Sequence, residues 1–225
     1  MDSLQKRALD VVGALAGLLI LAPLFALIAV AVRADSPGPV LFRHRRIGRN
    51  RKPFWMLKFR TMVRDALYLG PEVTTANDPR VTRLGRLLRR TKLDELPQLV
   101  NVLLGQMSLV GPRPQSYSFL PFYKEEDLDV ILSVRPGITG PTQLWLRHEE
   151  EILGMHDDPL TFYTGELLPR KIESDRRYAT GRSMAADAGI VARTLKAVVS
   201  LRPADLPERV AEVSVPAVRS LEKVG

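Results

Sequence analysis

The sequence predicts an α+β protein that is mainly helical, with an N-terminal re-entrant membrane helix (helix–break–helix) and a small globular domain. Three observations favour this fold class: an uncharged N-terminal run interrupted by a proline, two strand-like segments around a turn, and later segments with apolar residues at helical spacing. The predicted parts are residues 1–35 for the membrane helix, 36–202 for the globular domain and 203–225 for a C-terminal tail. We expect the globular domain to contain a short β-hairpin and surface amphipathic helices.

The composition narrows the class of protein. A chain of 225 residues can bury one good core. Its net charge of +8 indicates an anionic partner, for which nucleic acid, anionic lipid and phosphorylated small molecules all qualify. The chain has no cysteine, which excludes disulfides, thiol nucleophiles and cysteine-based zinc sites.

The uncharged N-terminal run covers residues 11–32, which is 22 residues. A straight helix of that length would extend about 33 Å and could cross a bilayer. Pro23, in the middle of the run, favours a break instead, and basic residues flank both ends without a clear inside–outside asymmetry. A helix that enters the membrane, breaks near Pro23 and leaves on the same face agrees with both features, although a buried core helix is an alternative.

A β-hairpin is expected next, with strands at residues 40–43 and 54–60 and a loop at 47–53. Nine basic residues and no acidic one lie between positions 43 and 64, and most of these suit a surface that faces solvent or lipid headgroups. Lys58 and Arg60 are singled out because they alternate with Leu57 and Phe59 and so point to the opposite face. Both side chains could bind phosphate oxygens.

Residues 77–90 follow as a capped, basic amphipathic helix with Leu84, Leu87 and Leu88 on its apolar side. Such a helix suits an anionic membrane surface and equally an ordinary protein surface. Arg89, near its end, is a candidate ligand for a diphosphate.

Two adjacent carboxylates, Asp94 and Glu95, precede a second helical run in which Pro97 suits the first turn and Gly105 the end. Such a pair is often only an N-terminal helix cap. Cations lie on both sides of it, however, and Arg113 follows in a Pro-Arg-Pro segment. Cations around two carboxylates form either a structural salt-bridge cluster or a site for a diphosphate and a divalent metal.

These residues carry a resemblance to the bacterial sugar transferase family, the monotopic phosphoglycosyl transferases. The similar motifs are LDELPQL (93–99), NVL (101–103), GQMSLVGPRP (105–114), KFRTM (58–62) and RPGITGP (135–141). The resemblance extends from Lys6 to Lys196, and the chain is similar to the small, single-domain members of the family. One departure is Ala22, where the family often has serine before the proline of the helix break.

The resemblance implies an enzyme that moves a sugar phosphate from a nucleotide sugar, such as a UDP-sugar, to polyprenol phosphate in glycoconjugate or exopolysaccharide synthesis. It implies that residues 36–202 are catalytic, that Asp94 is the nucleophile of a covalent phosphosugar intermediate, and that Glu95 holds Mg²⁺. The expected phosphate or nucleotide ligands are Lys58, Arg60, Arg89 and Arg113. The segment after Gly140 helps to complete the site in similar small members, without individual assignments.

The resemblance further implies a monotopic protein on the cytoplasmic face of the bacterial inner membrane, with membrane lipid as a partner and no nucleic acid. The sequence leaves the oligomeric state open, and a homodimer is compatible with it. A membrane-tethered binding protein for anionic lipid or nucleic acid is the alternative from another class, but it leaves Asp94 and Glu95 unexplained, and aromatic residues are only 6% of the chain. A hydrolase of nucleotide sugars on the same scaffold would differ by needing no lipid.

Overall fold

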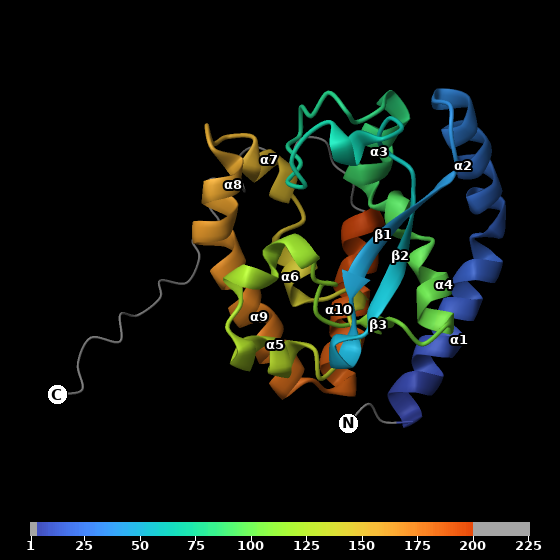
Figure 1. The fold of residues 1–225 in the computed structure, drawn as a ribbon. Helices are drawn as coiled ribbons and strands as arrows, with labels where there is room; N and C mark the ends of the chain where they lie inside the picture. Colours follow the sequence, from blue (N-terminus) through green and yellow to red (C-terminus); the bar gives the residue numbers. More distant parts are fainter. Residues whose placement is uncertain (1–3, 200–225) are drawn as a thin grey trace.

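The computed structural model describes residues 4–199 and consists mainly of helices with two small sheets (Figure 1). The helices are α1 (Leu4–Ile20), α2 (Ala22–Asp35), α3 (Arg83–Thr91), α4 (Gln98–Leu103), α5 (Glu125–Ile131), α6 (Pro141–Trp145), α7 (Glu149–Leu153), α8 (Pro159–Phe162), α9 (Leu168–Gly181) and α10 (Met184–Val199). The strands are β1 (Leu41–Ile47), β2 (Pro53–Phe59), β3 (Ser108–Val110) and β4 (Gly137–Thr139). The predicted tail at 203–225 lies outside the described residues, and the predicted domain boundaries stay a prediction.

The predicted break at Pro23 is confirmed as a bend of 63° between α1 and α2. Pro23 is the second residue of α2, where its missing N–H needs no partner. The break forms with Ala22 before the proline. Within residues 4–199 no single helix is long and apolar enough to cross a bilayer. Helices α1 and α2 have the required length and apolarity only when they are taken together as a bent pair.

The bent pair packs along one side of the globular part, with α1 against α4 and β3 and α2 against α3 and β2 (Figure 1). Polar contacts fix the start of α1. Lys6 Nζ lies 2.6 Å from Asp187 Oδ2 of α10, and the Tyr178 hydroxyl donates to the other oxygen of Asp187 at 2.8 Å. Asp10 accepts hydrogen bonds from the Ser108 hydroxyl and the Leu109 N–H, both at 3.0 Å. The first helix is therefore joined to β3 and to the last described helix.

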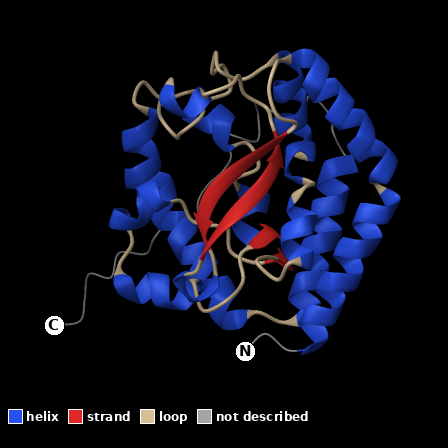
Figure 2. Cartoon of the chain, turned by 45° about the vertical axis from the view of Figure 1, so that its right-hand side comes forward, coloured by secondary structure: helices blue, strands red, loops and turns tan. Residues whose placement is uncertain are grey.

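The predicted β-hairpin is confirmed, with β1 and β2 antiparallel from the pair Leu41–Phe59 to the pair Ile47–Pro53. Figure 2 shows the hairpin in the middle of the molecule, with helices on both sides. Phe54 and Met56 are buried and alternate with exposed residues, so Lys58 continues their face of β2, opposite Leu57 and Phe59 as expected. Lys58 thus lies near the end of β2, beyond the buried Phe54 and Met56, where it contacts the carboxylate pair.

A parallel pair, β3 and β4, forms the second sheet, in register at Ser108–Gly137 and Val110–Thr139. It lies directly before the Pro-Arg-Pro segment. A Cβ at Gly137 would lie 2.0 Å from the Gly111 nitrogen, so the two backbones meet at a distance that only glycine permits. The close approach places Arg113 immediately beyond the sheet.

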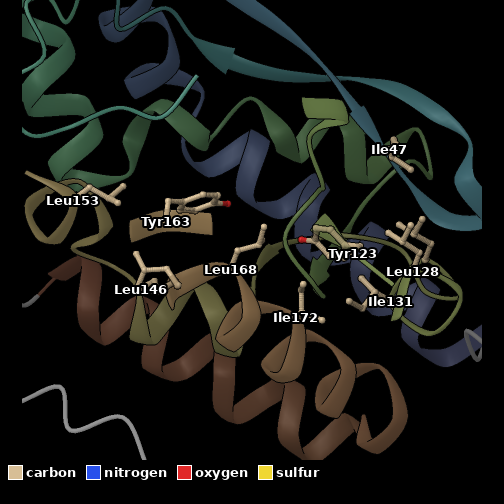
Figure 3. Packing of buried hydrophobic residues seen from close by; sticks show 11 residues of the cluster. Ile47, Tyr123, Leu128, Ile131, Leu146, Leu153, Tyr163, Leu168 and Ile172 are labelled. Atoms are coloured by element: carbon tan, nitrogen blue, oxygen red, sulfur yellow. The ribbon is translucent and has the colours of Figure 1, made fainter. Parts of the chain in front are cut away.

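The largest buried cluster joins the end of β1 to α5, α7 and α9 (Figure 3). Its members include Ile47, Ile131 and Leu168, with Leu153 and Tyr163 at one edge. Leu153 and Tyr163 also line a cavity of about 610 Å³, so this cluster forms part of the cavity wall.

Helix α3 begins later than the predicted residue 77. Asp78 does not cap a helix but binds the guanidinium of Arg80 at 2.6 Å, and the helix is capped by Thr82, whose hydroxyl accepts from the Gly85 N–H. The predicted apolar side is confirmed for Leu84 and Leu88, which pack against α2, whereas Leu87 is exposed.

Gly85→Ala is expected to destabilise the fold because a Cβ at Gly85 would lie 2.0 Å from the Thr61 carbonyl oxygen. Overpacking against backbone should cost about 3 kcal/mol, or roughly 6–12 °C in Tm. Thermal unfolding of the purified protein measures the shift. The matched control is Gly189→Ala, since no described atom lies within 4 Å of a Cβ there; the control should be neutral or slightly stabilising. Equal Tm values for both variants would contradict the close contact.

Candidate active site

The carboxylate pair lies in a 3₁₀ turn, η3 (Leu93–Glu95), between α3 and α4. Lys92 reverses the chain with a φ of 59°, so that Asp94 and Glu95 turn inward at the start of α4. Asp94 is buried, and its Oδ1 is buried without a hydrogen-bond partner among the described residues. A buried acceptor of this kind is rare in native proteins and often marks a functional group.

Two cations hold Glu95. Lys58 Nζ lies 2.6 Å from Glu95 Oε1 and 3.9 Å from Asp94 Oδ2. The Arg113 guanidinium lies 3.5 Å from the same Glu95 oxygen. The structure therefore brings Lys58, Asp94, Glu95 and Arg113 together, although they come from segments far apart in the sequence.

The two carboxyl groups have opposite electrostatic environments. Burial raises the pKa of Asp94, Lys58 opposes this effect, and the charge of Glu95 adds to it. Burial also favours a higher pKa for Glu95, but the charges of Lys58, Arg113 and Lys92 outweigh it and hold that pKa well below its usual range. Glu95 is thus a permanent anion, while Asp94 is a carboxylate whose charge is poorly compensated.

Asn101, a residue without a predicted role, fixes Lys58 relative to the carboxylates. Its side chain accepts from the Leu57 N–H at 3.0 Å and donates to the Trp55 carbonyl at 2.8 Å. A single side chain on α4 thereby pins β2 to the helix that follows the carboxylate pair.

The site opens into a cavity of about 610 Å³. Asp94, Lys58 and Arg113 lie on its wall, and so does Arg89, whose Nε donates to Glu150 at 3.0 Å. The cavity has the size of a small-molecule site. Binding of phosphate or nucleotide by Lys58, Arg89 and Arg113 stays a prediction.

Arg60 also reaches the cavity wall, but its guanidinium is used elsewhere. It donates to the carbonyls of Ser36 at 2.7 Å and Val32 at 3.2 Å, and to that of Pro37. These carbonyls end α2, so the structure gives Arg60 an anchoring role at the end of the helix pair. Phosphate binding by Arg60 stays a prediction.

Arg60→Met is expected to lower stability because three carbonyls lose a charged donor while the length of the side chain is kept. The cost should be about 2 kcal/mol, measured by thermal unfolding against the exposed Arg43→Met as control. A stability equal to that of the control would refute the anchoring role, and a separate rise in donor KM would support phosphate binding.

Several residues that line the cavity have no individual role predicted from the sequence. Glu149 and Glu150 of α7 lie on the wall, which places two members of the segment after Gly140 at the site. Lys171 of α9 and Tyr163 join them. They lie about 35–60 residues from the Pro-Arg-Pro segment in the chain, and no local pattern marks them.

A second set of missed residues lies on β1 and the loop after β2. His44 and Arg46 lie 3.4 Å and 3.2 Å from the same oxygen of Glu72. Burial raises the pKa of Glu72, but hydrogen bonds and the charge of Arg46 lower it to about 2. His44, for which the sequence indicates no role, lines the cavity together with Arg46 and Glu72.

Comparison with known proteins shows the family of this chain. The family model described as Bacterial sugar transferase matches residues 1–201, and the chain therefore belongs to the bacterial sugar transferase family, as the motifs predicted. It is 41% identical over 202 residues to the UDP-glucose:undecaprenyl-phosphate glucose-1-phosphate transferase of Caulobacter vibrioides (strain ATCC 19089 / CIP 103742 / CB 15), covering 88% of this chain and 70% of that protein.

Two further relatives are named for exopolysaccharide production. The protein PSS of Rhizobium leguminosarum bv. phaseoli is 44% identical over 64% of this chain and 75% of its own length. ExoY of Rhizobium meliloti (strain 1021) is 37% identical over 88% of this chain and 87% of its own length.

Proposed function

We propose that this protein transfers a sugar phosphate from a UDP-sugar to undecaprenyl phosphate, forming undecaprenyl-diphosphate-sugar and releasing UMP. The observation that carries the proposal is Asp94, buried at the wall of a cavity beside Lys58 and Arg113, with the adjacent Glu95 held by the same two cations. The names of the relatives support the two substrates. Exopolysaccharide or related glycoconjugate synthesis is the process that such a reaction would start.

The reaction is proposed to proceed in two displacements at one phosphorus atom. The Asp94 carboxylate forms a P–O bond with the sugar-bearing phosphate while the bond to the UMP oxygen breaks. The phosphate oxygen of undecaprenyl phosphate then attacks the same phosphorus and releases Asp94. Arg113 and Lys58 compensate the charge on the phosphate oxygens in both steps.

Mg²⁺ fits the donor set at this site. Both close cations of Glu95 approach Oε1, which leaves Oε2 without a partner among the described residues, and Asp94 Oδ1 is an unpaired buried acceptor. Mg²⁺ is held by one or two carboxylates together with phosphate oxygens and water. Glu95 would hold the ion, which neutralises phosphate charge when bound.

The bent helix pair supports a monotopic location. Large apolar side chains of α1 and α2 are exposed on the outer side, including Leu9, Leu19, Leu27 and Val30. A continuous apolar face of this kind suits lipid. We infer that α1 and α2 enter and leave the membrane on the cytoplasmic side of the inner membrane, where the lipid substrate's phosphate lies; a homodimer and the absence of a nucleic-acid partner stay predictions.

The location can be tested with single cysteines because the chain has none. Leu4→Cys and Asp35→Cys place a thiol at exposed positions at the two ends of the helix pair. An impermeant maleimide should label both only after the inner membrane is opened. Labelling of one position in intact spheroplasts would indicate a spanning helix instead.

The transfer itself is tested with purified protein, Mg²⁺, undecaprenyl phosphate and a panel of UDP-sugars. We expect UMP release that requires both the lipid and Mg²⁺ and stops on addition of EDTA. Release of UMP at full rate without lipid would favour the hydrolase. Tight lipid or nucleic-acid binding without turnover would favour the binding protein.

A further inference from the structure

Besides Asp94 and its neighbouring cations, the cavity wall carries a second polar group, formed by Glu149, Tyr163 and Lys171. Lys171 Nζ lies 2.8 Å from Glu149 Oε1 and 3.0 Å from the Tyr163 hydroxyl. Lys171 and Tyr163 are buried, with 5% and 8% of their surface exposed. Tyr163 begins the π-helical turn η5 (Tyr163–Leu167), a distortion that is frequent at functional sites.

The group has hydrogen-bonding capacity that the protein does not use. Among the described residues Glu149 Oε2 has no donor, the Tyr163 proton has no acceptor, and the ammonium of Lys171 makes two of its three bonds. These atoms offer one acceptor and two donors on the cavity wall. A purely structural ion pair between Lys171 and Glu149 would not require that Glu149, Tyr163 and Lys171 all line one cavity.

The chemistry of the group selects among parts of a nucleotide sugar. Burial raises the pKa of Glu149, but the charges of Lys171 and Arg113 outweigh this effect and lower it, so that Glu149 stays ionised. An ionised Glu149 would repel a phosphate. A nucleobase could not stack on the face of Tyr163 that Lys171 covers, with Nζ 4.6 Å from the ring centre. Hydroxyl groups both donate and accept, so they match the free atoms.

The position of the group indicates which hydroxyls it meets. Arg113 contacts Glu95 at 3.5 Å and lines the same cavity as Glu149; burial lowers the pKa of Arg113, but the charges of Glu95 and Glu149 outweigh this effect and raise it. If Arg113 holds the phosphate that Asp94 attacks, the sugar bonded to that phosphate is nearer to Glu149 than the ribose beyond a second phosphate. Phe119, with its ring centre 4.7 Å from that of Tyr163, adds an apolar surface for the C–H face of a sugar ring.

We propose that Glu149, Tyr163 and Lys171 form the subsite that binds the hydroxyl groups of the donor sugar and selects among sugars. The inference rests on the proposed transferase function and assigns its sugar specificity. A site built to bind a substrate hydroxyl discriminates strongly against an analogue that lacks it, because its own polar groups are then left unpaired.

The test compares donors that differ by one hydroxyl. The full chain in lipid nanodiscs with undecaprenyl phosphate is assayed for kcat/KM with the best UDP-sugar and with its analogues lacking single ring hydroxyls. Tyr163→Phe and Glu149→Gln are the variants, and UMP affinity is measured in parallel. Glu151→Gln is the matched control, since Glu151 lies on the same helix, pairs with His148 and does not line the cavity.

Tyr163→Phe should lower kcat/KM for the best donor about 10–100-fold while one deoxy analogue changes less than about 3-fold, so that selectivity collapses. UMP affinity should stay within about 3-fold of wild type. Equal losses for all donors together with weaker UMP binding would assign the group to the ribose and overturn the inference. Unchanged kinetics in both variants would mean that the group is only a structural ion pair, which would also overturn the inference. A wild-type protein inactive with every donor would instead overturn the proposed function.

Discussion

Asp94→Asn is expected to abolish transfer, with kcat reduced by at least about 10³-fold, because an amide cannot replace the carboxylate nucleophile. Without undecaprenyl phosphate, wild-type protein incubated with Mg²⁺ and the correct UDP-sugar should gain the mass of one sugar phosphate. The variant should gain none. Intact mass spectrometry records both results and identifies the sugar at the same time.

The variant should nevertheless fold. Because burial raises the pKa of Asp94 in the folded state, its ionised form costs stability once the pH exceeds the ordinary aspartate pKa, and the cost grows as the pH rises toward the folded value. Asparagine removes this cost, so Asp94→Asn should be at least as stable as wild type at neutral pH. Asp127→Asn, a buried aspartate that pairs with Arg176 at 3.0 Å away from the cavity, is the activity control. Product formation by Asp94→Asn near the wild-type rate would refute the nucleophile.

Lys58→Met should reduce kcat/KM about 10²–10³-fold near neutral pH, a loss typical of removing one charge-stabilising donor. The reason is that Lys58 binds Glu95 at 2.6 Å and opposes the raised pKa of Asp94. Without this cation the pKa of Asp94 rises further. Since the ionised carboxylate is the active form, the acid limb of the pH–rate profile should move to higher pH.

The ratio of variant to wild-type activity should therefore be smallest at low pH and recover as the pH rises. Lys58→Arg should restore part of the activity, and the exposed Lys124→Met should leave the profile unchanged. A constant ratio across the pH range would mean that Lys58 does not control the ionisation of Asp94. Stability should also fall by about 3 kcal/mol because a mostly buried ion pair is broken.

The parts of the fold that sequence predicts well depend on local chemistry. Pro23 predicts the bend, Gly105 with a φ of 76° ends the segment that begins at Pro97, and alternation along β2 predicts the direction of Lys58. Local patterns fail where a tertiary contact decides. Asp78 resembles a helix cap in sequence, but Arg80 binds it in the structure.

The candidate site divides in the same way. Asp94 and Glu95 are recognisable because they are adjacent and because the surrounding motif is long. Glu149 and Lys171 are ordinary charged residues on helical segments, and only the packing of α7 and α9 brings them to the cavity. Arg60 has the charge of a phosphate ligand, yet its neighbours are the carbonyls that end α2, which no sequence period predicts.

The Lys6–Asp187 ion pair has a consequence for how the protein is made. The two residues are 181 positions apart, so the first helix reaches the ribosome surface long before its partner is synthesised. Contacts of such separation form late in folding. The apolar helix pair can enter the membrane first, and the nascent chain then docks its finished globular part onto α1, with α10 completing the attachment. With the proposed membrane location, insertion would precede assembly of the active site.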